Sequence, residues 1–472
     1  MANFRIESDL LGERQVPAEA YYGVQTLRAM ENFHISGRTM NEYPNFIKGM
    51  AITKKAAAIA NEKVNMISAA QREAIVFACD ELLAGKYNDQ FPIDMIQGGA
   101  GTSTNMCANE VIANIGLEHM GKEKGDYKGN LTPNDHVNGS QSTNDAYPCG
   151  IHMAMYLEHL ELRKHLQMFI DSLQKKSDEF AHIIKMGRTQ LQDAVPMTLG
   201  QTFGGFAAAM RLELENLDHA AKEFLVVNMG ATAIGTGICA FPGYSEHCIK
   251  ALRDITGWDI TLAENLIEAT SSTACMLQYS AAMKRAAVRT NKICNDIRLM
   301  SSGPRCGLQE IHIPERQPGS SIMPGKVNPV IPEVMNQVCY KVIGNDTCIV
   351  MGADNAQLEL NVMEPVMAYT LFESVHLLMN GYDTLRTFCI DGIVANEKRC
   401  KELVEGSIGI ITMLNTIIGY KESTKIAREA TETGRGVYEL VLEHKLLTKE
   451  QLDTIMRPEN MLEAKDMRDV VK

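Results

Sequence analysis

Residues 258–302 read WDITLAENLIEATSSTACMLQYSAAMKRAAVRTNKICNDIRLMSS, and no glycine or proline interrupts them. These two residue types most often end or break a helix, so a stretch of this length without them predicts long helices. Small alanine side chains recur along it, and they allow helices to approach closely on more than one face. Examples are Ala269, Ala274, Ala281, Ala282, Ala286 and Ala287.

Two further segments, residues 151–186 and 206–229, also lack glycine and proline. At the 1.5 Å rise of an α-helix, the first would be roughly 54 Å long if it were wholly helical. Its apolar residues recur at helical intervals, at Leu157, Leu160, Leu166, Phe169, Ile170, Leu173, Phe180, Ile183 and Ile184. Helices of this length belong mostly to bundles or oligomer cores. The sequence therefore predicts a long helical bundle that completes its core through contact between subunits.

The remaining regions differ from this bundle in composition. Residues before about 140 contain shorter helical patterns broken by Gly/Asn/Pro segments, and residues after about 395 form a polar, charged region with short helical patterns. The sequence predicts an all-α, multihelical subunit in three parts. These parts are an N-terminal helical domain (1–140), a central long-helix bundle (141–395) and a small C-terminal helical domain (396–472).

Bulk composition excludes several classes of function. The formal net charge is −12, so the chain has no basic surface for nucleic acid or an anionic membrane. The N-terminus lacks an apolar signal region, and the longest apolar stretch, residues 406–420, is too short to span a bilayer. No CxxC or HExxH occurs among the 12 cysteines and 12 histidines, which favours free thiols in a reducing cytoplasm.

Three uncharged polar clusters stand in front of predicted helices. They are residues 98–105 (GGAGTSTN), 140–145 (SQSTND) and 187–193 (GRTQLQD), the last followed by Thr198 and Gln201 at the spacing of a capping box. Each cluster alone is typical of a helix N-cap with turn residues. Helix N-termini also attract carboxylates, and hydroxyl and amide side chains add donors without charge. Together the three clusters predict a pocket for a small, oxygen-rich anion.

Other chemistries find little support in the sequence. No GxxxxGK[ST] phosphate loop or GxSxG elbow is present. Lys326 lies in a glycine-containing loop, where its ammonium is better suited to clamping a carboxylate than to forming a Schiff base. His312 lies between apolar residues, where a histidine is more often structural than catalytic.

Residues 319–334 read GSSIMPGKVNPVIPEV, a loop in which two serines lie between glycines and precede one lysine and one asparagine. Glycine permits sharp turns, so this segment resembles a mobile active-site lid, and Pro332 is placed to open a helix over 333–343. The segment is similar to the signature loop of the aspartase/fumarase superfamily and, within it, of the aspartases. Residues 16–26 (VPAEAYYGVQT) and four further blocks carry the same resemblance.

The resemblance implies the reaction. Aspartases reversibly remove ammonia from L-aspartate to give fumarate without an organic cofactor, and some are stimulated by magnesium. The first serine of the loop, Ser320 here, takes the proton next to the β-carboxylate. Because that C–H is a very weak acid, the site must stabilise an enediolate-like carbanion, as an oxyanion hole does. Loop N–H groups and Lys326 are expected to keep Ser320 ionised when the lid closes.

The resemblance also implies the residues that bind this dicarboxylate substrate, and a homotetramer whose active sites are shared between subunits. Each expected role falls on a position of this sequence that matches the family motif. The β-carboxylate would be held by Thr102, Ser142, Thr143 and Ser321, the α-carboxylate by Lys326 and Asn328, and the amino group would lie near Asn144, Thr189 and Gln190.

Two residues depart from related patterns. Fumarases and some aspartases carry histidine where this chain has Gln190, and glutamine is neither an acid nor a base. The chain is therefore less suited to activating water, which favours aspartate deamination over the alternative of fumarate hydration. Cys107 replaces an asparagine found in many relatives. Bulky-substrate lyases of the superfamily and a purely structural role are weaker alternatives, because both loop serines and Lys326 are retained.

Overall fold

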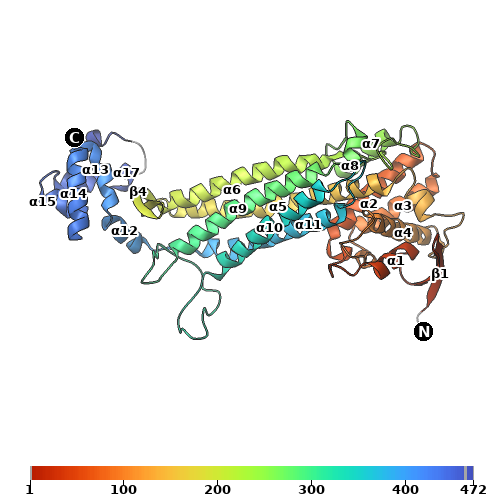
Figure 1. Cartoon of the computed structure of the whole chain (residues 1–472), viewed down its shortest axis with the longest axis horizontal. Helices are drawn as coiled ribbons and strands as arrows, with labels where there is room; N and C mark the ends of the chain where they lie inside the picture. The colour runs from red at the N-terminus through yellow and green to blue at the C-terminus, as the bar shows by residue number, and fades with distance from the viewer. Residues whose placement is uncertain (1–2, 462–464, 471–472) are drawn as a thin grey trace. The chain divides into compact units, whose positions relative to one another are not determined.

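The computed structural model describes residues 3–461 and 465–470, and its architecture is multihelical (Figure 1). The predicted all-α fold is confirmed. The helices of the N-terminal part are α1 (Val24–Asn32), α2 (Pro44–Lys63), α3 (Ala69–Leu83) and α4 (Thr102–His119). Five long helices follow among shorter ones: α5 (Thr143–Glu179), α6 (Leu199–Ala221), α7 (Tyr244–Thr256), α8 (Leu266–Ser271), α9 (Ala274–Met300), α10 (Val330–Asp354) and α11 (Glu364–Phe388). The last helices are α12 (Glu397–Glu405), α13 (Ile411–Ile418), α14 (Tyr420–Thr433), α15 (Val437–Glu443), α16 (Lys449–Ile455), α17 (Pro458–Met461) and α18 (Met467–Val470).

The strands form small two-stranded sheets rather than a sheet core. The antiparallel pairs are β1 (Phe4–Asp9) with β2 (Gly12–Pro17), β3 (Ile184–Thr189) with β4 (Gln192–Thr198), and β7 (Ile311–His312) with β8 (Val394–Ala395). One pair is parallel, β5 (Val226–Val227) with β6 (Thr261–Leu262).

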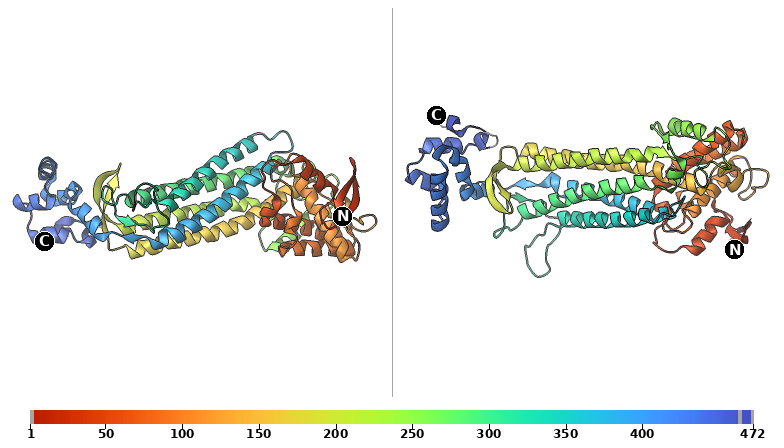
Figure 2. Two further views of the ribbon diagram at one scale, coloured as in Figure 1. Left: turned by 90° about the horizontal axis from the view of Figure 1, so that it is seen from below. Right: turned by 45° about the horizontal axis from the view of Figure 1, so that its top comes forward.

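The chain divides into two compact units. Unit 1 comprises residues 1–164, 214–287 and 340–379, and unit 2 comprises residues 165–213, 288–339 and 380–472. Helices α5, α6, α9, α10 and α11 each contribute one part to each unit, and within a unit these parts run side by side (Figures 1 and 2). The predicted domain boundaries at 140 and 395 stay a prediction.

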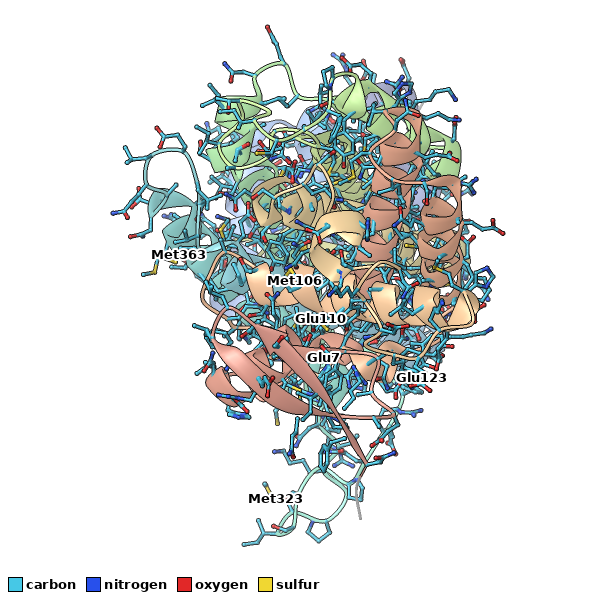
Figure 3. All side chains as sticks on the ribbon, turned by 90° about the vertical axis from the view of Figure 1, so that its right-hand side faces the viewer. Glu7, Met106, Glu110, Glu123, Met323 and Met363 are labelled. Atoms are coloured by element: carbon cyan, nitrogen blue, oxygen red, sulfur yellow. The ribbon has the colours of Figure 1, made fainter. Side chains whose placement is uncertain are left out.

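In unit 1, helix α2 packs against α3 and α7, and α3 packs against α4. Helix α1 is fixed to α4 by Glu110, whose buried carboxylate accepts hydrogen bonds from the backbone N–H groups of Gly23 (2.8 Å), Gln25 (2.8 Å) and Thr26 (3.1 Å). Glu7 of β1 lies beside Glu110 (Figure 3) and accepts a hydrogen bond from Val24 N at 3.0 Å. The N-terminal end of α1 therefore receives two carboxylates, which its free N–H groups and dipole favour.

In unit 2, the β3–β4 hairpin packs against α12 and the short helices beyond it form their own core. Figure 2 shows these helices gathered around one another. Their apolar interior is made by residues spaced for short amphipathic helices. It contains Ile411, Leu414, Ile426, Ala430, Val437, Leu440, Val441, Leu447, Leu452, Ile455 and Met467.

Helix α5 begins earlier than its glycine- and proline-free run predicts. It starts at Thr143, spans 37 residues and includes Pro148. Proline has no N–H, so the carbonyl of Asn144 loses its helical donor. Asn228 supplies a replacement, because its Nδ2 donates to the Asn144 carbonyl at 3.1 Å. A side chain distant in sequence thus allows proline inside the first turns of this helix.

The prediction of long helices over 258–302 is wrong for the first part of this segment. Residues 261–262 form β6, and the helical region is broken at Ser272 and Thr273 into α8 and α9. Asn265 caps α8 by accepting from Ile267 N (3.0 Å) and Glu268 N (3.1 Å). Serine, threonine and asparagine side chains form hydrogen bonds that compete with those of the helix backbone. These residues therefore interrupt the helix, although the segment contains no glycine or proline.

Two further features agree with the sequence. All 12 cysteines are free thiols. Within residues 3–461 and 465–470, none of the helices combines the length and apolar character needed to cross a membrane.

Candidate functional site

The first polar cluster forms the N-terminal end of α4. Thr102 opens the helix in an exposed position, and its hydroxyl donates to the carbonyl of Gly99 at 2.8 Å. Gln97 holds the next turn, because its Oε1 accepts from the backbone N–H of Thr104 at 3.1 Å. This arrangement presents a helix N-terminus with a hydroxyl at its first residue, as predicted.

Gly101 makes this turn possible. Its φ is +86°, and a Cβ there would lie 2.4 Å from the Tyr147 ring. We expect Gly101→Ala to lower the free energy of unfolding by about 2–5 kcal/mol, because backbone strain and overpacking add. Gly99→Ala is the matched control, since Gly99 also has positive φ (+88°) but only ordinary contacts around its Cβ position. It should cost about 1 kcal/mol. Equal loss of stability in chemical denaturation would contradict the packing argument.

The second cluster forms the N-terminal end of α5 and is tied to a loop at 228–233. Asp145 is fully buried and its carboxylate accepts from Ser142 N (2.9 Å), Gly230 N (3.1 Å) and Thr232 N (3.0 Å). Burial raises the pKa of Asp145 to about 6, against the effect of these donors. Asp145 thus joins the α5 N-terminus to residues far away in sequence.

Asn144 is held by the same loop. Its Nδ2 donates to the carbonyl of Ala233 at 2.7 Å, and Asn228 holds its backbone carbonyl. This hydrogen bond engages one of the two amide hydrogens, and Oδ1 is the side-chain atom that can accept a hydrogen bond from a ligand. That polarity suits an ammonium group, which only donates.

The two helix N-termini are connected by buried amides. Asn105 on α4 donates through Nδ2 to the hydroxyl of Thr143 at 3.2 Å. Lys54 lies behind them with 0% of its surface exposed, and its Nζ donates to Asn105 Oδ1 at 2.6 Å. The structure therefore brings the first and second clusters together within unit 1.

The third cluster is not a helix N-terminus, which corrects the prediction. Residues 187–193 belong to the β3–β4 hairpin, in which Thr189 pairs with Gln192. Gln190 (φ +55°) and Leu191 (φ +62°) form its two-residue turn, a combination typical of type I′ hairpins. Antiparallel pairing around this two-residue turn determines the structure of the segment, whereas its polar composition suggested the start of a helix. The capping box of Thr198 and Gln201 is confirmed at the start of α6.

Side-chain hydrogen bonds hold the base of this hairpin, and its turn is exposed to solvent. Arg188 donates to the fully buried Glu310 at 2.8 Å, and Ser407 donates to Asp193 at 2.8 Å. Thr189 and Gln190 are exposed. The turn therefore exposes two residues that are predicted to lie near the amino group of the substrate.

The signature loop closes on itself within unit 2. Gly319 N donates to Lys326 O at 2.8 Å, and Asn328 Nδ2 donates to Gly319 O at 2.7 Å. Ser320 Oγ accepts from the backbone N–H groups of Ile322 (3.2 Å) and Met323 (3.0 Å). Two N–H donors on one hydroxyl oxygen favour its ionised form. Ser321 and Lys326 are exposed, and Met323 marks the loop in Figure 3.

The predicted site residues are distributed over both units. Unit 1 holds Thr102, Ser142, Thr143 and Asn144, and unit 2 holds Thr189, Gln190, Ser320, Ser321, Lys326 and Asn328. Sequence reasoning missed the buried Lys54 and the 228–233 loop with Asn228 and Thr232. The only local signal was the glycine-rich run 230–237 (GATAIGTG), which resembles an ordinary loop in composition.

Unit 1 offers uncharged donors at two helix N-termini, and the loop of unit 2 offers a hydroxyl with two N–H donors and a lysine. Such groups suit a carboxylate rather than a metal ion. Among the described residues, no three His, Cys, Asp or Glu side chains are grouped as metal ligands.

Comparisons with known proteins agree with these features. Residues 12–344 match the family model described as Lyase, and residues 410–463 match the one described as Fumarase C C-terminus. The chain is 54% identical over 462 residues to an aspartate ammonia-lyase of Pseudomonas canavaninivorans, covering 98% of this chain and 97% of that protein. It is 53% identical over 461 residues to that of Escherichia coli, covering 98% and 96%. The crystal structure of a Brucella melitensis protein described as fumarate lyase:delta crystallin, bound to cobalt, matches with a TM-score of 0.95 at 47% identity, covering 98% of this chain and 100% of that one. The chain therefore belongs to the aspartase/fumarase superfamily of lyases, within its aspartate ammonia-lyase group.

Proposed function

We propose that this protein is a carbon–nitrogen lyase that reversibly removes ammonia from L-aspartate to give fumarate. The observation that carries the proposal is 53–54% identity to aspartate ammonia-lyases over 98% of the chain. The polarity of Asn144 and the absence of an acid or base at Gln190 support an ammonium-bearing substrate.

Ser320 is the proposed base. Its alkoxide removes a proton from the carbon next to the β-carboxylate, and the electron pair spreads into that carboxylate. The C–N bond then breaks, ammonia leaves and the double bond of fumarate forms. The N–H groups of Ile322 and Met323 favour the alkoxide. Hydrogen-bond donors whose interaction strengthens as charge develops on the β-carboxylate lower the activation barrier. Donors that bind the ground state and the transition state equally do not.

The remaining residues bind the substrate. Thr102, Ser142, Thr143 and Ser321 hold the β-carboxylate in this proposal. Lys326 and Asn328 hold the α-carboxylate, and Asn144, Thr189 and Gln190 surround the amino group. The Thr102 and Thr143 hydroxyls stand at helix N-termini, where backbone dipoles favour a carboxylate.

The proposed assembly is a homotetramer whose active sites draw residues from more than one subunit. Large apolar side chains on the long helices are exposed in the isolated chain, which is unfavourable unless another surface covers them. They include Leu212, Val288, Val334, Val350 and Met351. Light scattering on the purified protein tests this, and a monomeric mass would contradict it.

No organic cofactor enters the proposed reaction, because proton abstraction and carbon–nitrogen cleavage require no electron sink beyond the carboxylate. Activity measured with and without a chelator tests whether a divalent cation such as magnesium stimulates the reaction. The free thiols of all 12 cysteines support a reducing, cytoplasmic location.

Substrate choice is the test of this function. We expect formation of fumarate from L-aspartate, followed by its ultraviolet absorbance, and no appreciable dehydration of malate. Gln190 offers no general base for water, so kcat/KM should favour aspartate by at least about 100-fold, the contribution of one general base. Fumarate hydratase is the runner-up. Comparable kcat/KM values for the two substrates would establish that alternative.

A further inference from the structure

Lys54 is a buried cation whose hydrogen bonds go to neutral groups. It lies on α2 with 0% of its surface exposed. Its Nζ donates to Asn105 Oδ1 (2.6 Å), Gln141 Oε1 (2.9 Å) and Asn138 Oδ1 (3.2 Å). Burying a lysine is costly, and three amide oxygens compensate only in part. Its placement behind both helix N-termini therefore calls for a functional explanation.

The ammonium fixes the direction of the surrounding hydrogen bonds. It has three donors and no acceptor, so the amides must face it with their oxygens. The NH₂ group of Asn105 is then directed away, to Thr143 Oγ1 (3.2 Å) and Asn138 Oδ1 (3.0 Å). Asn109 donates to the same Asn138 oxygen at 3.0 Å, which makes that oxygen the shared acceptor of the network.

The chain of donors ends at Thr143. Because Thr143 Oγ1 accepts from Asn105, its own O–H is available as a donor, and the described residues offer this hydrogen no acceptor. Thr143 is half-buried at the first position of α5. A ligand oxygen in front of this helix end would receive the hydrogen bond.

We propose that Lys54 is a positioning residue that polarises the Thr143 hydroxyl through Asn105, so that a second, buried cation stabilises the charge developing on the substrate β-carboxylate. This inference rests on the proposed deamination. Proton abstraction gives that carboxylate enediolate character and more negative charge. In a buried setting a fixed cation interacts strongly with such a charge, and chained hydrogen bonds polarise one another. The benefit is larger in the transition state than in the ground state, so it should appear mainly in kcat.

The surroundings of Lys54 set the pH range of this effect. Burial lowers the pKa of Lys54 to about 7, while Asp145 on α5, Cys79 on α3 and Cys149 on α5 act in the opposite direction. A lysine is charged below its pKa and neutral above it. The advantage of wild type over a variant without this amine should therefore shrink as pH rises through about 7.

The primary test compares Lys54→Met with Lys55→Met. Lys55 is the next residue on α2 and forms an ion pair with Asp80, so its loss removes a lysine without touching the network. We expect Lys54→Met to lower kcat about 10- to 100-fold with KM within about threefold, and Lys55→Met to match wild type. The ratio of wild-type to Lys54→Met kcat/KM should also fall between pH 6 and pH 8.5.

Two inhibitors separate charge stabilisation from mere folding. Succinate mimics the ground state, whereas ionised 3-nitropropionate carries a nitronate that mimics the carbanion. Lys54→Met should weaken nitronate binding at least about 10-fold and succinate binding less than about threefold. Equal weakening of both, or no change in kcat, would overturn the relay and leave Lys54 a structural residue.

If Lys54→Met does not fold, Asn105→Asp provides a second test of the relay. This substitution keeps the size of the side chain. The new carboxylate still accepts from Lys54 but has no donor for Thr143, whose hydroxyl would then turn toward it. We expect the same selective loss of nitronate binding, and the effect of Thr143→Val on kcat should vanish in this background. Additive effects of Asn105→Asp and Thr143→Val on kcat would contradict the relay. If wild type does not deaminate aspartate, the proposed function fails. In that case the relay would still be supported if wild type binds the nitronate more tightly than succinate and Asn105→Asp loses this preference.

Discussion

Ser320→Ala should nearly abolish deamination while leaving the binding of unreactive dicarboxylates such as succinate within a few-fold of wild type. A base is needed only for proton transfer, and general-base contributions are about 10²–10⁴ in rate. So weak a carbon acid should place the loss at or above this range. The measurement is kcat by fumarate absorbance together with succinate inhibition.

Ser321→Ala is the matched control for Ser320→Ala, because it removes the neighbouring, chemically identical hydroxyl. Ser321 is assigned to the β-carboxylate, so its loss should weaken succinate binding as well as slow turnover. Ser320 Oγ accepts from two loop N–H groups at 3.2 Å and 3.0 Å. Because the loop is exposed, water can accept these hydrogen bonds when the hydroxyl is removed. If Ser320→Ala retains more than about a tenth of wild-type kcat, another group is the base.

Lys326→Ala should lower kcat/KM by about 10- to 150-fold, corresponding to about 1.5–3 kcal/mol for one charge-assisted contact. Its backbone closes the loop by accepting from Gly319 N at 2.8 Å, whereas its side chain is exposed and has no partner within the described part of the chain. The ammonium is therefore available to a substrate carboxylate. Both KM and kcat should change, because in the proposed mechanism the lysine binds the substrate and stabilises ionised Ser320.

Lys326→Met and Lys326→Arg separate charge from shape. Methionine keeps the long stem without the charge and should behave like alanine, whereas arginine keeps the charge and should recover part of kcat/KM. Wild-type KM and kcat in Lys326→Met would place this lysine outside the active site.

Helix content could be predicted because its signals are local. Runs without glycine and proline located most of α5, α6 and α9, but not α10 and α11, which contain both residue types. The Thr198–Gln201 spacing located the start of α6. The same reasoning failed at residues 261–273, where polar side chains interrupt a run free of glycine and proline. It failed again at the 187–193 cluster, because composition does not distinguish a helix N-cap from a type I′ hairpin turn.

The sequence by itself determined the helical architecture, the two polar helix N-termini at Thr102 and Thr143, and the loop that carries Ser320. Tertiary structure decided which distant groups support them. Asn228 compensates for Pro148 by donating to the Asn144 carbonyl across 84 positions, and Lys54 contacts Asn105 across 51 positions. Propensity and capping act within a few residues of the chain, and they are written in local sequence. Burial of a cation and the direction of its hydrogen bonds depend on which helices pack together, so only the folded chain reveals them.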